Sequence, residues 1–495
     1  MVASIGAIAS AAQGVSYYEK DGYYAKDDAA HKEASAWRGR GAEAMGLSGP
    51  VEPDAFEKVL QGFVPDGRRL GKKDRDGNFH HRPGIDVTMS APKLVSLAAL
   101  VGGDRRIVKA HARAVKRTLG WIENRAVETR VMDPATRAMV RKGNQKMVAA
   151  TFTHDTSRNL DPQLHTHAVI ANMVQGEDQK WRTMVNDGVY RGVMAIGAIY
   201  RAELARGLER LGYGIEKTHS DGRFEIEGVS REVIESFSTR RAEIVEAMEE
   251  WGLGEPGDNA RLADRAALMT RAHKRDVDKG RLQRDWSKQA SELGFSAKRL
   301  VSGAKKRASK EHSSRSQADL FANPDFTAAQ SARWAVDHLS ERQSVFTHND
   351  LLTGVLARDP GAVTVEAAEK AIADLADNGT LHRAGIGLPR ASGHAVGWTT
   401  DAALARESET IALMRAGQGK GPRMMRRWVA TLSQLTRARH VSSSPMLLTG
   451  SVQREKRSRP TNSATCQWRS RAVSLYRVVT LGNGGQLEGL LTGHQ

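Results

Sequence analysis

The chain has 495 residues, enough for two or three domains, and no apolar run approaches the roughly 20 residues that cross a membrane. Its single cysteine, Cys466, excludes a disulfide framework and thiolate metal ligands, and it fits a reducing cytoplasm. The net charge of +17 is unevenly distributed along the chain. Residues from Lys420 onward hold thirteen Lys and Arg against two Glu, so residues 1–419 carry only +6. This mildly basic charge is compatible with DNA binding but not diagnostic of it.

The N-terminal segment carries two tyrosine pairs, Tyr17-Tyr18 and Tyr23-Tyr24, within SYYEKDGYYAKDD. The residues before this stretch lack the basic region of a signal peptide, so none is expected. Two packing anchors are the alternative interpretation, although the pairs have few aliphatic neighbours. A tyrosine that attacks a phosphodiester conserves the bond energy as a phosphotyrosine. With a pKa near 10, its phenol then needs help from a base or a divalent metal.

Residues 84–90, GIDVTMS, predict a buried strand with Asp86 inside it. Ser90 is expected to cap a helix through KLVSLAALVG, and a second helix follows from residue 104 with Ile107 and His111 on its apolar face. A carboxylate in a buried strand is costly without a partner. Asp86 is therefore a candidate to accept a proton or to orient a metal-binding histidine, with a structural carboxylate as the alternative.

Three histidines lie in FTHDTSRNLDPQLHTHAVIANM, residues 152–173. MVAATFTH and LHTHAVIANMV each predict a strand, and the turn-forming residues between them favour a hairpin. Because strand side chains alternate, His165 and His167 share one face, and His154 can reach it from the partner strand. A chance H-x-H pair is the plainer alternative. Three convergent imidazoles would bind a divalent metal, for which we expect Mg²⁺ or Mn²⁺.

The pattern over the first 300 residues mixes strands and helices, which indicates an α+β fold. Further helices are predicted near 192–211, 230–252 and 262–292. The Ser-, Lys- and Arg-rich stretch 301–325 predicts a linker. Residues 326–419 predict three helices and a hairpin, as in a winged-helix-like module, with a small helical domain as the alternative. Residues 420–495 lack sustained periodicity and predict a basic, disordered tail.

These motifs together resemble conjugative relaxases of the TrwC/TraI type, the MobF family of the HUH single-strand endonucleases. The resemblance rests on four segments in order: SYYEKDGYYAKDD, GIDVTMSAPKLVSLAAL, FTHDTSRNLDPQLHTHAVIANM and QKWRTMVNDGVY. It implies a central antiparallel sheet flanked by helices, a palm for single-stranded DNA, over residues 1–300.

The resemblance also implies roles for individual residues. His154, His165 and His167 match the metal triad, and Asp86 matches the acidic helper. Tyr17 matches the first nucleophile and Tyr23 resembles the second, with Tyr18 and Tyr24 as alternates. The expected reaction is strand-specific nicking and rejoining at a plasmid transfer origin. From charge and aromatic content alone, three further residues are candidate DNA contacts: Lys180, Trp181 and Arg182.

Family members commonly continue into a helicase, and residues 326–419 resemble its entry region. A phosphate loop requires G-x-x-x-x-G-K-[ST], and GQGKGP at 417–422 does not match, so no ATPase or helicase activity is expected. The expected partners are transfer-origin DNA, an accessory nicking protein, a coupling ATPase and type IV secretion machinery, in the bacterial cytoplasm with export alongside the DNA. A rolling-circle replication initiator and a non-catalytic single-stranded-DNA-binding remnant are the alternatives.

Overall fold

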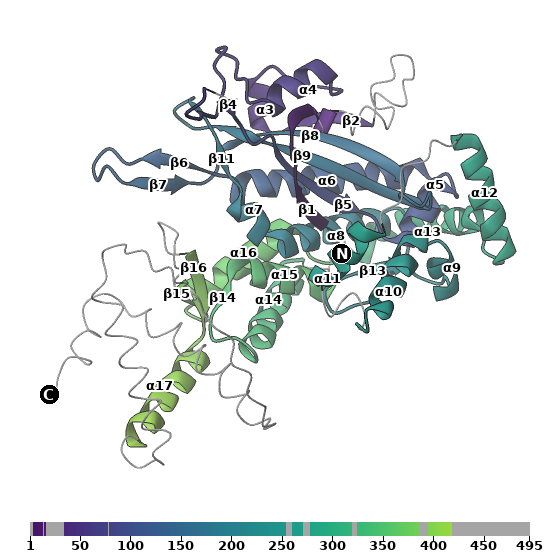
Figure 1. Cartoon of the computed structure of the whole chain (residues 1–495). Coiled ribbons are helices and arrows are strands. Elements are labelled where there is room, and N and C mark those ends of the chain that lie inside the picture. The colour runs from purple at the N-terminus through teal and green to yellow at the C-terminus, as the bar shows by residue number, and fades with distance from the viewer. Residues whose placement is uncertain are drawn as a thin grey trace, which may run out of the picture. The chain divides into compact units, whose positions relative to one another are not determined.

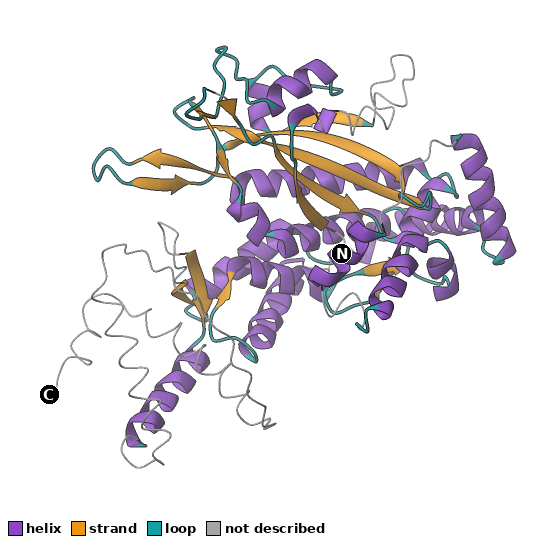
Figure 2. Cartoon of the chain, viewed as in Figure 1, coloured by secondary structure: helices purple, strands orange, loops and turns teal. Residues whose placement is uncertain are grey.

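The structure is a computed structural model that describes residues 3–12, 14–15, 34–77, 79–253, 260–270, 278–318, 324–386 and 395–417. The chain divides into two compact units, Met1–Val336 with Asn349–Asp374 and Asp337–His348 with Leu375–Gln495. The first unit is an α+β fold, as predicted (Figures 1 and 2). None of the helices within the described ranges is long and apolar enough to cross a membrane.

A central antiparallel sheet organises the first unit, with strands in the order β1-β5-β9-β8-β2 and β10 paired to β9 (Figure 1). Its strands are β1 (Ala3–Ala7), β2 (Ser35–Arg38), β5 (Gly84–Ser90), β8 (Lys146–Thr156), β9 (Pro162–Gln175) and β10 (Trp181–Arg182). The expected sheet flanked by helices is therefore confirmed. At Gly84 a side chain would not fit against β9, because a Cβ there would lie 2.2 Å from the Ile170 carbonyl oxygen.

The two faces of this sheet differ in what covers them. On the back face, Ile85, Val87 and Met89 of β5 are buried. Helices α5 (Lys93–Leu100), α6 (Arg105–Arg125) and α8 (Val193–Glu209) cover this side (Figure 1). The alternate residues of β5, including Asp86, point to the opposite face, which we call the front face, and they are less buried.

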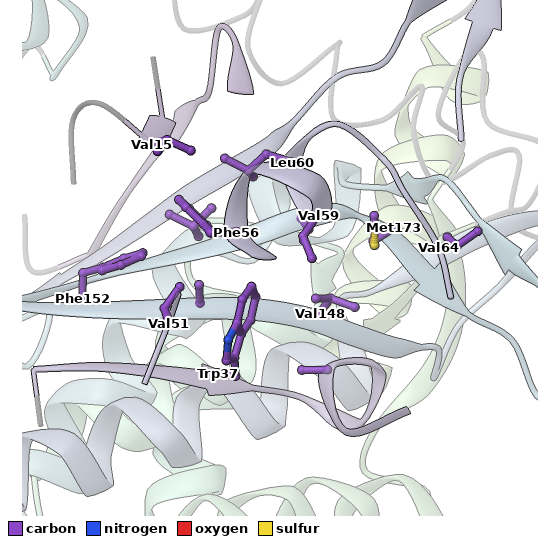
Figure 3. Packing of buried hydrophobic residues seen from close by; sticks show 14 of the residues in the cluster. Val15, Trp37, Val51, Phe56, Val59, Leu60, Val64, Val148, Phe152 and Met173 are labelled. Carbon is purple, nitrogen blue, oxygen red and sulfur yellow. The ribbon is translucent and has the colours of Figure 1, made fainter. Parts of the chain in front are cut away.

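Part of the front face is closed by an apolar cluster under α3 (Arg40–Ala44) and α4 (Pro53–Leu60). Phe56 of α4 contacts Phe152 of β8 edge to face, with ring centroids 5.2 Å apart (Figure 3). Val15 and Leu60 belong to the same cluster, which forms one side of the core. The cluster ends at Phe152, so the front face beyond that residue is left for polar side chains.

Smaller elements complete the first unit. There are three short sheets. In the first, β6 (Glu128–Met132) lies between β11 (Met184–Val185) and β7 (Met139–Lys142); the other two pair β12 (Ile215–Lys217) with β13 (Phe224–Ile226) and β3 (Lys72–Lys73) with β4 (Phe79–His80). The remaining helices are α7 (Asp187–Arg191), α9 (Arg231–Ser236), α10 (Thr239–Glu250), α11 (Ala260–Met269), α12 (Lys279–Glu292), α13 (Ala297–Ala318), α14 (Pro324–Ser340), α15 (His348–Arg358) and α16 (Val365–Asp377). The helix predicted near 192–211 is confirmed as α8. The helix predicted near 230–252 forms two helices, α9 and α10, and the one predicted near 262–292 covers α11 and α12.

Two local predictions are wrong. Residues 301–318 are not a linker, because they continue α13, whose Val301 and Ala304 are buried at helical spacing. Arg307 of the same helix donates a hydrogen bond to the Gly212 carbonyl oxygen over 2.7 Å. Ser90 does not cap α5 but ends β5, and Pro92 takes the N-cap position.

The predicted winged-helix-like module at 326–419 contains the expected helices and hairpin. In the second unit, β15 (His382–Ile386) pairs antiparallel with β16 (Ala395–Thr399), which also pairs with β14 (Phe346–Thr347), and α17 (Asp401–Ala416) follows. Helices α15 and α16 belong largely to the first unit. The limits of the module as a domain stay a prediction, and the predicted tail at 420–495 lies outside the described residues.

A buried histidine lies between the back of the sheet and α8. His111 of α6 is fully buried, with one ring nitrogen 2.7 Å from the Tyr200 hydroxyl and the other 2.7 Å from the Thr166 hydroxyl. Burial lowers its pKa to about 3, so the ring is neutral at every physiological pH.

We expect His111 to make folding sensitive to acid. In the unfolded chain its pKa returns to about 6.5, so below that pH the unfolded state binds more protons and stability falls, by about 1.4 kcal/mol per pH unit. Urea unfolding at pH 7.5 and 5 measures the loss. The variant His111→Gln should lose about 2 kcal/mol less than the wild type over this range. Equal losses in both proteins would contradict a neutral buried imidazole.

Candidate metal centre

The β8–β9 hairpin brings three histidines together on the front face of the sheet. His154 pairs directly with His165, and Phe152 pairs with His167, so all three imidazoles point the same way. Their ring centroids are 4.7, 4.7 and 5.2 Å apart, and one ligand nitrogen from each lies within 4.8 Å of the others. The side chains therefore converge as the strand alternation predicted.

Hydrogen bonds orient two of the rings. His167 Nδ1 lies 2.6 Å from Asp86 Oδ2 and 3.1 Å from the Thr88 hydroxyl. His165 Nδ1 lies 3.0 Å from the Gln163 carbonyl oxygen. A ring nitrogen facing a carboxylate or carbonyl carries the proton, which leaves Nε2 of each ring as the lone-pair donor.

His165 suits a divalent metal because it is available as a neutral ligand. Burial, together with the neighbouring His167, lowers the pKa of His165 to about 4. At neutral pH the ring therefore carries no proton on its donor nitrogen. Three imidazole donors on one side of an ion leave its remaining coordination positions open.

The tip of the hairpin is held by helices that the sequence did not connect to it. Thr239, which begins α10, donates a hydrogen bond to the Asp161 carboxylate over 2.8 Å. Trp286 of α12 donates its indole N–H to the Leu160 carbonyl oxygen over 2.8 Å. The pairing of β8 and β9 is irregular between His154 and Thr156, so these contacts hold the strand ends where the ladder is weakest.

Helix α5 supports the other side of the same turn. The Ser96 hydroxyl accepts the Leu164 backbone N–H over 3.0 Å, and Lys93 Nζ donates to the Pro162 carbonyl oxygen over 3.1 Å. The Glu225 carboxylate accepts the backbone N–H groups of Lys93 and Leu94 at the start of the helix. These contacts thus fix where β9 begins, at Pro162, three residues before His165.

The four predicted tyrosines, Tyr17, Tyr18, Tyr23 and Tyr24, lie outside the described residues. The chain on either side of them is described. Val15 packs in the front-face cluster, and the Ala34 carbonyl oxygen accepts the backbone N–H of Thr153 over 2.8 Å. Thr153 is adjacent to His154, so Ala34, the first described residue after the tyrosines, lies beside the strand position that carries this histidine.

The candidate DNA contacts at 180–182 need correction. Trp181 is only 8% exposed and belongs to the apolar cluster, so its ring is not available for stacking on a base. Arg182 forms an ion pair with Asp178 over 2.5 Å. Lys180 is exposed. The sequence suggested an aromatic side chain presented between two cations. Side chains alternate along β10, however, and this alternation directs the Trp181 ring into the core.

Comparison with known proteins agrees with this geometry. A family model described as TrwC relaxase matches residues 11–293. The multifunctional conjugation protein TraI of Escherichia coli K12 is 37% identical over 400 residues, which cover 78% of this chain and 21% of that protein. The chain therefore spans about a fifth of the length of the curated relatives it matches.

Solved structures give the same result. The conjugative relaxase TrwC in complex with oriT DNA, in a metal-free form, is 37% identical with a TM-score of 0.53, covering 59% of this chain and 99% of that chain. A metal-bound structure of the TrwC–oriT complex is 38% identical with a TM-score of 0.54, covering 60% and 99%. With a family model matching more than half of its length, the chain belongs to the TrwC relaxase family.

Proposed function

We propose that this protein nicks one strand of DNA at a plasmid transfer origin and rejoins it during conjugation. The observation that carries the proposal is the convergence of His154, His165 and His167 on the open part of the front face. Membership of the TrwC relaxase family and the oriT DNA in the TrwC structures support the same substrate.

The proposed reaction is a transesterification by tyrosine. The Tyr17 phenol loses its proton as its oxygen bonds to phosphorus, the bond from phosphorus to the 3′ oxygen breaks, and the departing 3′ oxygen takes up one proton, so the step is proton-neutral. The 5′ phosphate remains on the tyrosine, and reversal of the step rejoins the strand. Tyr23 serves as the second nucleophile while Tyr17 is occupied. The described ends of this segment, at Val15 and Ala34, support its approach to the front face.

We infer that the three histidines hold a divalent metal, as the metal-bound TrwC structure supports. When bound, such an ion neutralises charge on the non-bridging oxygens of the scissile phosphate. We expect Mg²⁺ or Mn²⁺. The imidazoles contribute no negative charge of their own, so the site retains its attraction for the phosphate.

Asp86 acts on His167 in this proposal. Its carboxylate lies 2.6 Å from Nδ1 of His167 and so fixes the ring with Nε2 directed at the metal position. The alternative, acceptance of the tyrosine proton, would neutralise the carboxylate and so weaken its hydrogen bond to His167. The geometry therefore favours orientation of the ligand over proton transfer.

The proposed setting follows from conjugation. We infer that the protein works in the bacterial cytoplasm with an accessory nicking protein, a coupling ATPase and type IV secretion machinery, and that it is exported with the DNA. The name of TraI as a conjugation protein supports this setting.

Removing the metal should stop cleavage. With a supercoiled plasmid that carries the cognate origin, we expect chelator to abolish nicking and Mg²⁺ or Mn²⁺ to restore it. His165→Ala and His167→Ala should nick at least 100-fold more slowly, while binding of single-stranded DNA changes little. Nicking at the wild-type rate by the double variant would rule out the triad.

Asp86→Asn tests the orienting role. An amide keeps the size of the side chain but loses the charge that holds His167, so we expect metal affinity about 10- to 100-fold weaker. Calorimetric titration with Mn²⁺ measures the change. Thr88→Val is the matched control, because it removes a longer hydrogen bond to the same nitrogen and should cost less. A larger loss at Thr88 than at Asp86 would contradict this assignment.

Tyr17→Phe should abolish the first nick on supercoiled DNA, whereas Tyr23→Phe should spare most of it, since the second nucleophile is needed only after the first is occupied. On a single-stranded oligonucleotide, Tyr23 should contribute visibly to strand transfer. Mass spectrometry of the trapped covalent peptide identifies the residue. A DNA adduct on Tyr18, or on none of the four tyrosines, would contradict the assignment.

The purified chain should hydrolyse no ATP in response to DNA, because its 495 residues contain no phosphate-loop sequence. A coupled assay for ADP release, with and without single-stranded DNA, tests this expectation. Hydrolysis that rises with DNA and persists in independent preparations would require a nucleotide site of another kind.

A further inference from the structure

A line of buried hydrogen bonds reaches the metal-binding strands from behind. It runs from the Tyr200 hydroxyl on α8 to His111 on α6, then to the Thr166 hydroxyl on β9, and ends at the Thr153 hydroxyl on β8. The three distances are 2.7, 2.7 and 2.9 Å. His111 and Tyr200 are fully buried, and Thr166 is 1% exposed.

The line ends between the ligands. Thr166 separates His165 from His167 along β9, and Thr153 precedes His154 on β8. Thr153 and Thr166 form a direct cross-strand pair on the back face, next to the pair of His154 with His165 on the front face. Any movement of Thr166 is therefore passed to both histidines of the H-x-H pair.

The bond between Thr153 and Thr166 lies at the end of the hairpin where regular strand pairing stops. The regular pairing of β8 and β9 is lost between His154 and Thr156, immediately beyond the ligands. On the other side of the triad the strands are held by apolar packing on both faces, as at Phe152 and Ala168. The bond between Thr153 and Thr166 is thus a side-chain link at the last regular part of the ladder, and His111 anchors it to the helices.

Packing alone would not require these polar groups. An imidazole buried without charge must satisfy both ring nitrogens, and a leucine or methionine in this place would avoid that cost. His111 meets the requirement with one hydroxyl from a helix and one from the strand that carries two ligands. Burying these polar groups costs stability. The cost is explained if the hydrogen bonds serve to place β9, and with it His165 and His167, accurately.

We propose that His111 is a positioning residue for the metal centre, holding β9 so that His154, His165 and His167 converge. The inference rests on the proposed metal-binding role of the triad. His111 touches no ligand and acts through Thr166, so its loss should weaken the metal without removing any donor atom.

Two substitutions separate positioning from packing. In His111→Gln, the amide reaches the place of ring Nε2 and keeps the bond to Thr166 while losing Tyr200. In His111→Asn, the amide takes the place of Nδ1 and keeps Tyr200 while losing Thr166. Each variant loses one hydrogen bond, so their urea unfolding midpoints without metal should be similar. Affinity for Mn²⁺, measured by calorimetric titration of the full chain, should fall about tenfold in His111→Asn and less than twofold in His111→Gln.

Thr166→Val tests the same link from the strand side and serves if His111→Asn fails to fold. It should weaken Mn²⁺ binding to a similar extent, and combining it with His111→Asn should add little, since both remove one connection. Equal Mn²⁺ affinities in the two His111 variants, or wild-type affinity in Thr166→Val, would overturn the proposal.

His154→Ala distinguishes this failure from failure of the proposed site. It should weaken Mn²⁺ binding more than any change at His111, because it removes a ligand. Wild-type affinity in His154→Ala would overturn the metal site itself, and the positioning proposal with it. Lost affinity in His154→Ala together with unchanged affinity in His111→Asn and Thr166→Val would overturn only the positioning role.

Discussion

The register between β8 and β9 is the constraint on which the site depends. Side chains in a strand alternate with a period of two, so a slip by one residue would turn His165 and His167 into the helix-covered back face and bring Thr166 to the front. The slip is opposed by the back-face residues Leu164, Ala168 and Ile170, all of which are buried. The apolar packing behind the sheet thus determines which face presents the imidazoles, and the ligand geometry follows from ordinary core formation.

His165 can lie close to two other imidazoles because it is uncharged there. Its low pKa reflects burial and the neighbouring His167, so its protonation is unfavourable at neutral pH. Asp86 is the carboxylate that bonds directly to a ligand, and it meets His167 at the nitrogen facing away from the metal position. A bound divalent ion would keep most of its charge for a phosphate, which differs from sites in which several carboxylates neutralise the ion.

The sequence was informative where the determining contacts are local. The H-x-H spacing, the turn residues after His154 and the strand character of both flanks were sufficient to predict convergence. Asp86 could be proposed but not assigned a role, since its distance from His167 depends on pairing between strands 81 residues apart. The contact between His111 and Tyr200 spans 89 residues and had no local signal. Trp181 and α13 were misjudged because composition was weighed above spacing, and in both cases the periodicity of the element decides which residues are buried.

The order of the strands places the described residues on either side of the tyrosines. β1 and β2 are consecutive in the sequence but lie at opposite edges of the sheet, with β5, β9 and β8 between them. On the way from β1 to β2, Val15 packs in the front-face cluster, and Ala34 accepts a backbone hydrogen bond from Thr153, the residue before His154. The described residues on either side of the proposed nucleophiles are therefore held by the front-face cluster and by the strand that carries His154. The metal ligands, in contrast, lie on strands fixed by the core. The proposed function therefore divides between two parts of the chain, with the metal and phosphate site on core-packed strands and the proposed attacking groups on the connection between β1 and β2.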